Sequence, residues 1–224
     1  MKQQLKRYSK NILNHTRYAK IFRKYHTYTM IPKETYIENL TLIEQYKTIK
    51  GLVVECGVWR GGMSAGIADV LGADRTYYLF DSFEGLPEAK AIDGEGAIAW
   101  QKNIHSPDYF ENCKAEMSWA EEALNLSPAK NHFLVKGWFN ETLPQFNSKE
   151  EIAILRLDGD WYESTMDCLV NLYPKVVKGG LIVLDDYYLW DGCSKAVHDY
   201  LSKNSIPARI KQFNDGNIHY IIKS

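Results

Sequence analysis

Residues 53–62 read VVECGVWRGG, an apolar run that ends in a glycine-rich turn. Apart from Glu55, the run 52–56 is hydrophobic throughout, which is typical of a strand buried on both faces of a parallel sheet. The glycines allow the backbone to approach a ligand, and a helix predicted over 62–71 would present its N-terminus to an anionic group. The spacing is GxxxGG, whereas dinucleotide-binding proteins carry GxGxxG, so a nicotinamide enzyme is disfavoured.

Apolar runs and helical patterns alternate along the rest of the chain. Four further strands are predicted from the runs 76–80, 132–135, 152–157 and 181–184. Between the last two, apolar residues recur at helical spacing over 162–177, and helices are also expected at 36–49 and 194–201. This order predicts a parallel sheet that is covered by helices on both faces.

The end of the chain departs from this alternation. Residues 208–213 and 218–222 resemble strands, and the turn Asn214-Asp215-Gly216 separates them. Asp-Gly between two strand-like runs is a hairpin signal. We therefore expect an α/β domain with a mostly parallel sheet and an antiparallel C-terminal hairpin.

The first 30 residues form a basic segment with eight cationic side chains and no carboxylate. Apolar residues recur in it at helical spacing, so we predict a basic helical arm over 1–35, followed by one domain over 36–224. The arm either attaches to an anionic membrane or partner, or packs its apolar stripe on its own domain or on a second subunit. The second interpretation is favoured, and it includes a homo-oligomer held through the arm.

Composition narrows the class of protein. The net charge of −1 gives no reason to expect a nucleic-acid partner. We expect no transmembrane segment, since no apolar run approaches the ~18 residues of a span, and no signal peptide, since no apolar stretch follows the basic start. The four cysteines are scattered without CxxC spacing, which favours buried thiols in a cytoplasmic protein.

Residues 83–106 contain Gly85, Pro87, Gly94 and Gly96 and show little periodicity. This composition predicts a long loop beside a strand end. Long loops inside compact domains are often lids over a site, and a disordered surface insertion is the alternative interpretation.

A carboxylate ends the second predicted strand. Asp81 lies 26 residues after Glu55, at the end of the run 76–80. An acidic side chain at this place suits hydrogen bonds to ribose hydroxyls, as in other nucleoside-binding α/β folds. A helix or turn cap is the alternative for Asp81.

Two acidic pairs end the fourth and fifth predicted strands, at Asp158-Gly159-Asp160 and Asp185-Asp186. Ligands of an open parallel sheet bind beyond the carboxyl ends of its strands, so these carboxylates are expected to meet there. Four neighbouring carboxylates repel one another unless a cation lies among them, and oxygen ligands favour Mg²⁺ or Mn²⁺. Each aspartate alone could cap a helix, but two pairs on adjacent strands favour a metal site.

Longer segments of the chain resemble a known family. They are YTMIP (28–32), VVECGVWRGG (53–62), LFDSFEGLP (79–87), GWFNETLP (137–144), LRLDGDWYESTMDCLVNLYPK (155–175) and GGLIVLDDY (179–187). In this order, over roughly residues 28–200, the chain is similar to the macrocin O-methyltransferases, which are metal-dependent sugar methyltransferases that use S-adenosylmethionine. Motifs as long as FDSFEGLP and LDGDxYEST are hard to match by chance.

The resemblance implies a Rossmann-like S-adenosylmethionine methyltransferase fold with seven strands, the last pair antiparallel. It assigns cofactor binding to Glu55, Gly57, Arg60, Gly61, Ser64, Asp81, Ser82, Gly137, Trp138 and Asp158. It assigns the metal to Asp158, Asp185 and Asp186. Asp160 is the candidate general base, because it follows a metal ligand by two residues and the alternation of a strand lets it point elsewhere.

The implied reaction is methyl transfer to a metal-activated hydroxyl of a sugar or of a glycosylated small molecule, and a small catechol-like diol would serve equally well. Two alternatives remain: a metal-dependent glycosyltransferase that uses Asp158-Gly159-Asp160, and a non-catalytic subunit that only binds cofactor. The basic arm and the C-terminal NIHYIIKS do not match the family pattern. His198 and His219 are outside candidates for a base, although a lone histidine is more often structural.

Overall fold

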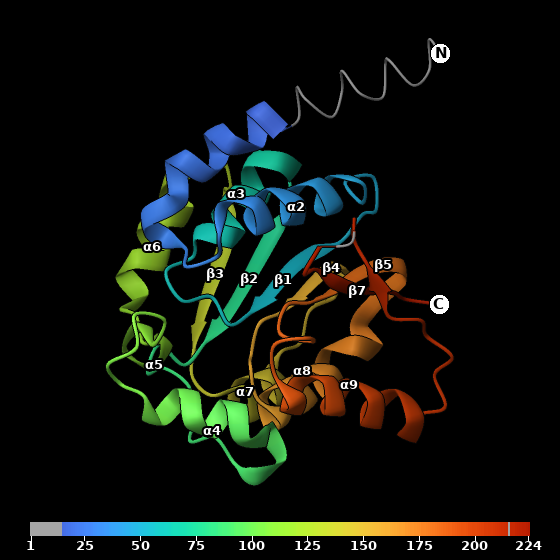
Figure 1. The fold of residues 1–224 in the computed structure, drawn as a ribbon. Helices are drawn as coiled ribbons and strands as arrows, with labels where there is room; N and C mark the ends of the chain where they lie inside the picture. The colour runs from blue at the N-terminus through green and yellow to red at the C-terminus, as the bar shows by residue number, and fades with distance from the viewer. Residues whose placement is uncertain (1–14, 215) are drawn as a thin grey trace, which may run out of the picture.

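The computed structural model describes residues 15–214 and 216–224. Its strands form one seven-stranded sheet in the order β3-β2-β1-β4-β5-β7-β6 (Figure 1). The parallel strands are β1 (Leu52–Cys56), β2 (Thr76–Asp81), β3 (Asn131–Lys136), β4 (Ile152–Leu157) and β5 (Val176–Leu184). The antiparallel strands are β6 (Lys211–Gln212) and β7 (His219–Ile222). The predicted fold class, a mostly parallel sheet with antiparallel C-terminal strands, is therefore confirmed.

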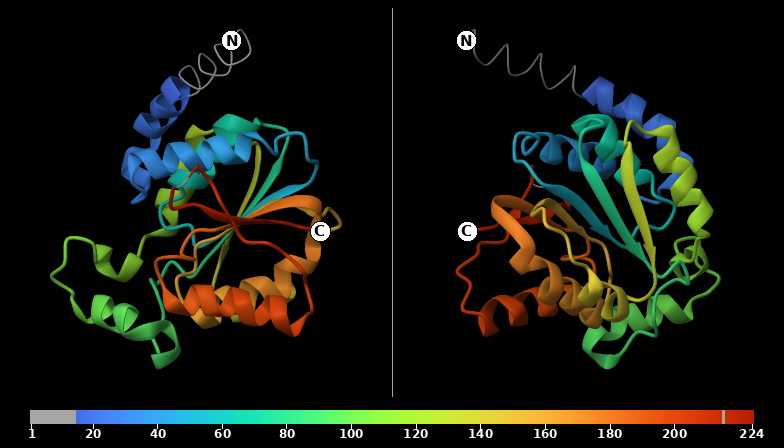
Figure 2. Two further views of the ribbon diagram at one scale, coloured as in Figure 1. Left: turned by 45° about the vertical axis from the view of Figure 1, so that its right-hand side comes forward. Right: turned by 180° about the vertical axis from the view of Figure 1, so that it is seen from behind.

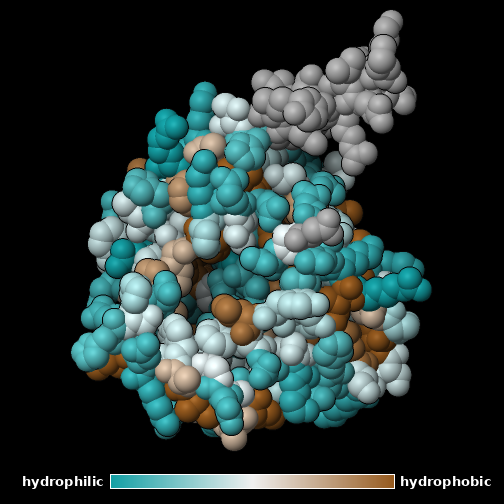
Figure 3. All heavy atoms as spheres, in the orientation of Figure 1, coloured by the Kyte–Doolittle hydropathy of each residue, from teal (hydrophilic) through white to brown (hydrophobic). Residues whose placement is uncertain are grey.

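Helices cover both faces of this sheet (Figure 2). One face packs against α2 (Lys33–Glu44), α3 (Gly62–Leu71) and α6 (Met117–Leu126). The other face packs against α8 (Tyr162–Leu172) and α9 (Asp191–Lys203), with the short α7 (Phe139–Thr142) beside them. β1 and β4 are buried at every position, which agrees with their hydrophobic runs. Hydrophilic residues cover most of the outer face seen in Figure 3.

The described part of the basic arm packs on its own domain. Residues 15–25 are helical, and Tyr18 and Tyr25 are fully buried in the core under α2 and α3. The Tyr25 hydroxyl donates to Asp69 at 2.7 Å, and Arg17 forms an ion pair with Glu44 at 2.8 Å. Residues 1–14, which complete the predicted arm, lie outside the described residues.

The expectation of a loop throughout residues 83–106 was wrong, because Gly94–Lys102 forms helix α4. Gly94 begins this helix with a φ of +90°, and Gly96 faces open space, so neither glycine interrupts it. Four residues, Phe110–Cys113, form the short turn α5 with left-handed backbone angles. The whole segment lies beyond the carboxyl ends of the strands (Figures 1 and 2).

The C-terminal hairpin is shorter than expected. β6 spans two residues where the sequence predicted a strand over 208–213. Ile206, Ala208 and Ile210 are partly buried against the second core instead of pairing with β7. An apolar run does not by itself distinguish a strand from a loop that packs on a core.

The strand register brings the ends of the central strands together. Cys56 pairs with Phe80 and Leu157, and Leu157 pairs with Leu184. The residues that come next continue this alignment, since Asp158 N donates to the carbonyl of Cys56 and Asp185 N to that of Leu157, both at 2.9 Å. The glycine turn and both acidic pairs therefore meet at one edge of the sheet.

Candidate active site

A cavity of about 660 Å³ opens at this edge of the sheet. Of the residues predicted for the site, the following line it: Gly57, Asp81, Ser82, Gly137, Trp138, Asp158, Asp160, Asp185 and Asp186. Its lining does not include Glu55, Arg60, Gly61 or Ser64. The predicted residues thus form one site in two layers, a lining and a support behind it.

The turn after β1 approaches its neighbours very closely at Gly57. This glycine has a φ of +85°, and a Cβ at the position would lie 1.6 Å from the carbonyl oxygen of Asp158. No other residue fits there without displacing the backbone that carries the acidic pair. The next residue but one, Trp59, also has a left-handed φ, of +48°.

Asp81 holds this turn and the one after its own strand. Oδ2 accepts hydrogen bonds from the backbone of Val58 at 2.6 Å and Trp59 at 2.9 Å, and Oδ1 accepts one from Phe83 at 2.6 Å. Burial raises the pKa of Asp81, and these three donors oppose that shift. The turn cap that the sequence left as an alternative is present, and Oδ1, which accepts one hydrogen bond, keeps a second lone pair for a ligand hydroxyl.

Glu55 lies beneath the cavity, with only 1% of its surface exposed. The Ser64 hydroxyl donates to one of its oxygens, and Arg156 donates to the other at 2.8 Å. Burial raises the pKa of Glu55 to about 7, against the lowering effects of Arg156 and Ser64. Glu55 and Ser64 therefore join β1 to α3 and support the glycine turn from behind.

Arg156 is a buried cation that the sequence interpretation missed. Its guanidinium is 1% exposed and lies 2.8 Å from Glu55, 2.6 Å from Asp158 and 2.6 Å from Asp185. One arginine thus contacts carboxylates from β1 and from the loops after β4 and β5. The available signal was a single charge inside the apolar run Ile152–Leu157.

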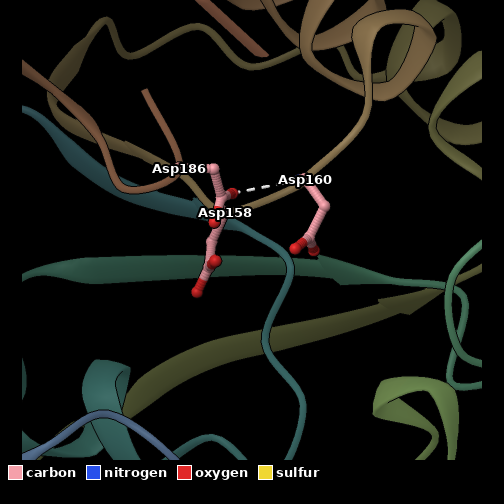
Figure 4. Close-up of side chains that lie close together, drawn as sticks. All are labelled: Asp158, Asp160 and Asp186. Atoms are coloured by element: carbon pink, nitrogen blue, oxygen red, sulfur yellow. Dashed lines mark hydrogen bonds between the residues drawn. The ribbon is translucent and has the colours of Figure 1, made fainter. Parts of the chain in front are cut away.

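Asp158, Asp160 and Asp186 converge in the cavity, each with a carboxylate oxygen within 4.8 Å of the others (Figure 4). The backbone N–H of Asp160 donates to Asp186 at 3.0 Å and joins the two loops. Burial and the neighbouring Asp158 raise the pKa of Asp160 to about 7. Burial, with Asp160 and Asp158 close by, also raises the pKa of Asp186.

The grouping differs from the expected metal ligands at one position. Asp185 lies against Arg156, outside the cluster, and Asp160 takes its place in it. Asp158 and Asp186 belong to both the expected and the observed set. The chemistry of the cluster fits a divalent ion, because three buried or partly buried carboxylates converge and burial raises the pKa values of Asp160 and Asp186. Among the described residues, Arg156 pairs with Asp158 alone of the three.

The cavity also fits a nucleoside cofactor. The indole Nε1 of Trp59 is buried without a hydrogen-bond partner among the described residues, and Trp59 lines the cavity. A buried orphan donor is uncommon and is satisfied when a ligand supplies an acceptor. Next to Asp81, whose carbonyl accepts a hydrogen bond from the backbone N–H of Gly137, this glycine has a φ of +144°, and Trp138 is 37% exposed. Arg60 packs its guanidinium over Trp59, 4.3 Å from the ring centre, so it contacts the lining from behind.

The segment 83–113 covers this cavity. Pro87 accepts a hydrogen bond from the Trp161 indole at 2.9 Å, and buried Asp93 accepts one from the backbone of Tyr162 at 2.7 Å. Lys90 also forms an ion pair with Glu163. The cover is therefore tied to the N-terminus of α8, directly after the acidic pair.

Neither outside candidate for a base lies in the cavity lining. His198 pairs through Nε2 with the Tyr187 hydroxyl at 2.8 Å, and His219 stacks on Tyr188 with 4.4 Å between ring centres. Burial lowers the pKa of His219. Their contacts are with aromatic side chains outside the cavity lining, which agrees with the structural role expected more often for a lone histidine.

A doubly covered sheet of this strand order, with a glycine turn after β1 and acidic residues after β2, β4 and β5, defines a Rossmann-like methyltransferase fold. The family model of macrocin O-methyltransferase (TylF) matches residues 2–221. The chain belongs to this family. The resemblance that the motifs suggested is confirmed, and a glycosyltransferase has no support from the family.

The chain is also similar to individual methyltransferases. It is 37% identical over 177 residues to the 8-demethyl-8-(2,3-dimethoxy-alpha-L-rhamnosyl)-tetracenomycin-C 4'-O-methyltransferase of Streptomyces olivaceus, which covers 77% of this chain and 66% of that protein. It is 37% identical over 169 residues to the demethyldecarbamoylnovobiocin O-methyltransferase of Streptomyces niveus, covering 70% and 61%. The match to the mycinamicin III 3''-O-methyltransferase of Micromonospora griseorubida is 34% identical over 181 residues, covering 77% and 68%. The matched regions thus span about two thirds of these relatives.

Solved structures agree with the family. The O-methyltransferase NovP superposes with a TM-score of 0.69 at 32% identity, over 88% of this chain and 82% of that one. The calicheamicin methyltransferase CalS11 gives 0.68 over 92% and 91%, and at 22% identity it shows the fold alone. Within residues 15–214 and 216–224, no helix is both long and apolar enough to cross a membrane.

Proposed function

We propose that this chain is an S-adenosylmethionine-dependent O-methyltransferase whose acceptor is a hydroxyl of a sugar or of a glycosylated small molecule. The observation that carries the proposal is a single cavity lined by the Gly57 turn, by Asp81 and by the converging Asp158, Asp160 and Asp186 carboxylates. The similarity to O-methyltransferases of glycosylated compounds supports the acceptor class.

The side chains divide the work. Asp81 and the orphan Trp59 indole would hold the cofactor. Asp158 and Asp186, which belong to both the expected and the observed set, would hold Mg²⁺ or Mn²⁺. When bound, S-adenosylmethionine supplies an electrophilic methyl group and the ion supplies positive charge that acidifies the acceptor hydroxyl. Asp160 would take the hydroxyl proton onto its carboxylate as methyl transfer proceeds. A pKa near 7 suits this role, because the group can both accept and release a proton close to neutral pH.

The segment 83–113, which covers the cavity, would place the acceptor. Neighbouring hydroxyls of a sugar could occupy two positions near the acidic cluster at once, so a vicinal diol is the favoured acceptor. Holding the hydroxyl oxygen in line with the methyl carbon and sulfur would supply much of the remaining acceleration.

The test is methyl transfer from labelled S-adenosylmethionine to a panel of methyl glycosides that carry vicinal diols, with methyl 2,3-dideoxyglycosides as controls. We expect transfer to the diols that EDTA abolishes and Mg²⁺ or Mn²⁺ restores. Transfer that EDTA leaves intact would remove the metal from the proposal.

A non-catalytic cofactor-binding subunit is the remaining alternative. Asp158→Asn separates the two, since it should abolish turnover and keep most of the affinity for S-adenosylhomocysteine. Wild-type protein that binds this product yet methylates no acceptor would favour the subunit. The cytoplasmic location and the homo-oligomeric state remain predictions from the sequence.

A further inference from the structure

We propose that Trp190 is the residue that positions the candidate general base, Asp160. The proposal rests on the proposed function and adds a residue to it. The indole Nε1–H of Trp190 donates to Oδ1 of Asp160 at 2.8 Å. Because this bond engages one oxygen of the carboxylate, we assign the other oxygen, Oδ2, as the atom that takes the proton of the substrate hydroxyl.

The bond closes a ring of hydrogen bonds between two loops. The backbone N–H of Asp160 donates to the side chain of Asp186, and the backbone N–H of Trp190 donates to the carbonyl of Asp186, both at 3.0 Å. Trp190 and Asp186 thus hold Asp160 through its main chain and its side chain together. This matters because Asp160 has a φ of +58°, a left-handed conformation that a non-glycine residue keeps only when its surroundings impose it.

The orientation of the Trp190 ring is itself fixed by two other tryptophans. Its ring packs edge-to-face against Trp161, with 5.2 Å between centres, and against Trp100, with 5.9 Å. Trp100 belongs to α4 of the cover and Trp161 follows Asp160 directly. The orientation of the Asp160 carboxylate therefore depends on how the segment 83–113 packs over the cavity.

Trp190→Phe tests the role, because it keeps a ring in the aromatic cluster and removes only the indole donor. Tyr162→Phe is a matched control, since it also removes an aromatic donor from an aspartate, the 3.0 Å bond to Asp199, outside the cavity. Partners that orient functional side chains are typically worth about 10–100-fold in activity. We expect kcat to fall by this amount in Trp190→Phe and to stay near the wild-type value in Tyr162→Phe.

The affinity for S-adenosylhomocysteine and the KM for the acceptor should change little in Trp190→Phe, because the donor acts on the base alone. A fall in kcat together with an equal loss of cofactor affinity would indicate general damage to the cavity and overturn the assignment. Equal kcat values in Trp190→Phe and Tyr162→Phe would overturn it as well.

A second measurement needs no acceptor. The chain has six tryptophans, and the indole N–H resonance of Trp190 is the one that disappears from the ¹⁵N-correlated spectrum of Trp190→Phe. In Asp160→Asn this resonance should move upfield by more than the other five, because the charged acceptor is lost. An unmoved resonance would show that Trp190 does not hold Asp160. If instead the wild-type protein binds no S-adenosylhomocysteine, the proposed function fails, and this spectrum still decides the Trp190–Asp160 pairing.

Discussion

The guanidinium of Arg156 lies 2.6 Å from a carboxylate oxygen of Asp185, beside the three aspartates that converge in the cavity. The same group contacts Glu55 and Asp158, and the arginine side chain is almost completely buried. One buried cation therefore balances part of the charge of five neighbouring carboxylates. It also ties the support of the glycine turn to the two loops that carry the candidate metal ligands.

Replacing this cation by Met should destabilise the protein strongly. Arg156→Met keeps much of the side-chain length and leaves buried carboxylates without their partner, which costs about 3–5 kcal/mol. Urea unfolding followed by circular dichroism measures the loss. Lys195→Met is the control, because Lys195 and Asp199 form an exposed pair on α9 that should contribute far less. Similar losses in the two variants would mean that Arg156 is not needed for the charge balance of the site.

Asp160→Asn should separate proton transfer from metal binding. We expect turnover to fall by about 10²–10⁴-fold, the range for a general base, while the affinity for Mn²⁺ measured by electron paramagnetic resonance changes little. Asp186→Asn should instead weaken Mn²⁺ binding markedly. If Asp160→Asn loses Mn²⁺ as completely as Asp186→Asn does, then Asp160 is a ligand of the ion, as its place in the observed cluster permits, and the base lies elsewhere.

The stability of the metal-free protein should fall as pH rises from about 4 to 7. The pKa of Asp160 is about 7 in the folded protein and near 4 when unfolded, so over this range the folded state binds more protons. Unfolding then becomes more favourable as the pH increases, and the raised pKa of Asp186 acts in the same direction. Bound Mg²⁺ favours the ionised forms, so the gain in melting temperature from Mg²⁺ should be larger at about pH 8 than at about pH 5. An equal gain at both values would contradict the charge repulsion inferred for the cluster.

Gly57→Ala should disturb the site as well as the backbone. Its Cβ would collide with the carbonyl of Asp158, whereas Gly179→Ala offers a control with a similar φ of +81° and nothing within 4 Å. In the control, only the strain of a left-handed alanine should lower the free energy of unfolding, by about 1–2 kcal/mol. We expect the larger loss in Gly57→Ala, together with a fall of more than about tenfold in affinity for S-adenosylhomocysteine by calorimetry. Unchanged cofactor affinity in Gly57→Ala would separate this turn from the cofactor site.

The sequence allowed the fold to be predicted because the buried strands and their helices have distinct patterns. The run 52–56 and the helix over 62–71 fall where predicted, since each is continuous and bounded by glycines. The pattern failed for α4, where two glycines inside a short amphipathic helix resemble loop composition. It failed again for 208–213, because an apolar loop that packs on the core has the composition of a strand.

The site residues that directly follow strand ends could be predicted from the sequence. The contacts between side chains that are far apart in the sequence could not. Asp158 and Asp186 meet because parallel strands end at one edge, which the order of elements implies. The partners of Asp160 and Asp185 do not follow from that order. Trp190 reaches Asp160 from 30 positions along the chain, and Arg156 reaches three carboxylates from three strand ends. Such pairings depend on side-chain orientation, which spacing alone does not specify.

Calorimetric titration of the purified protein with S-adenosylhomocysteine, first with Mg²⁺ and then with EDTA, tests most directly whether this cavity binds the cofactor. We expect micromolar binding in both conditions with only a modest difference, because the metal should contact the acceptor more than the cofactor. No detectable binding in either condition would contradict the assignment of this cavity to an S-adenosylmethionine-dependent methyltransferase.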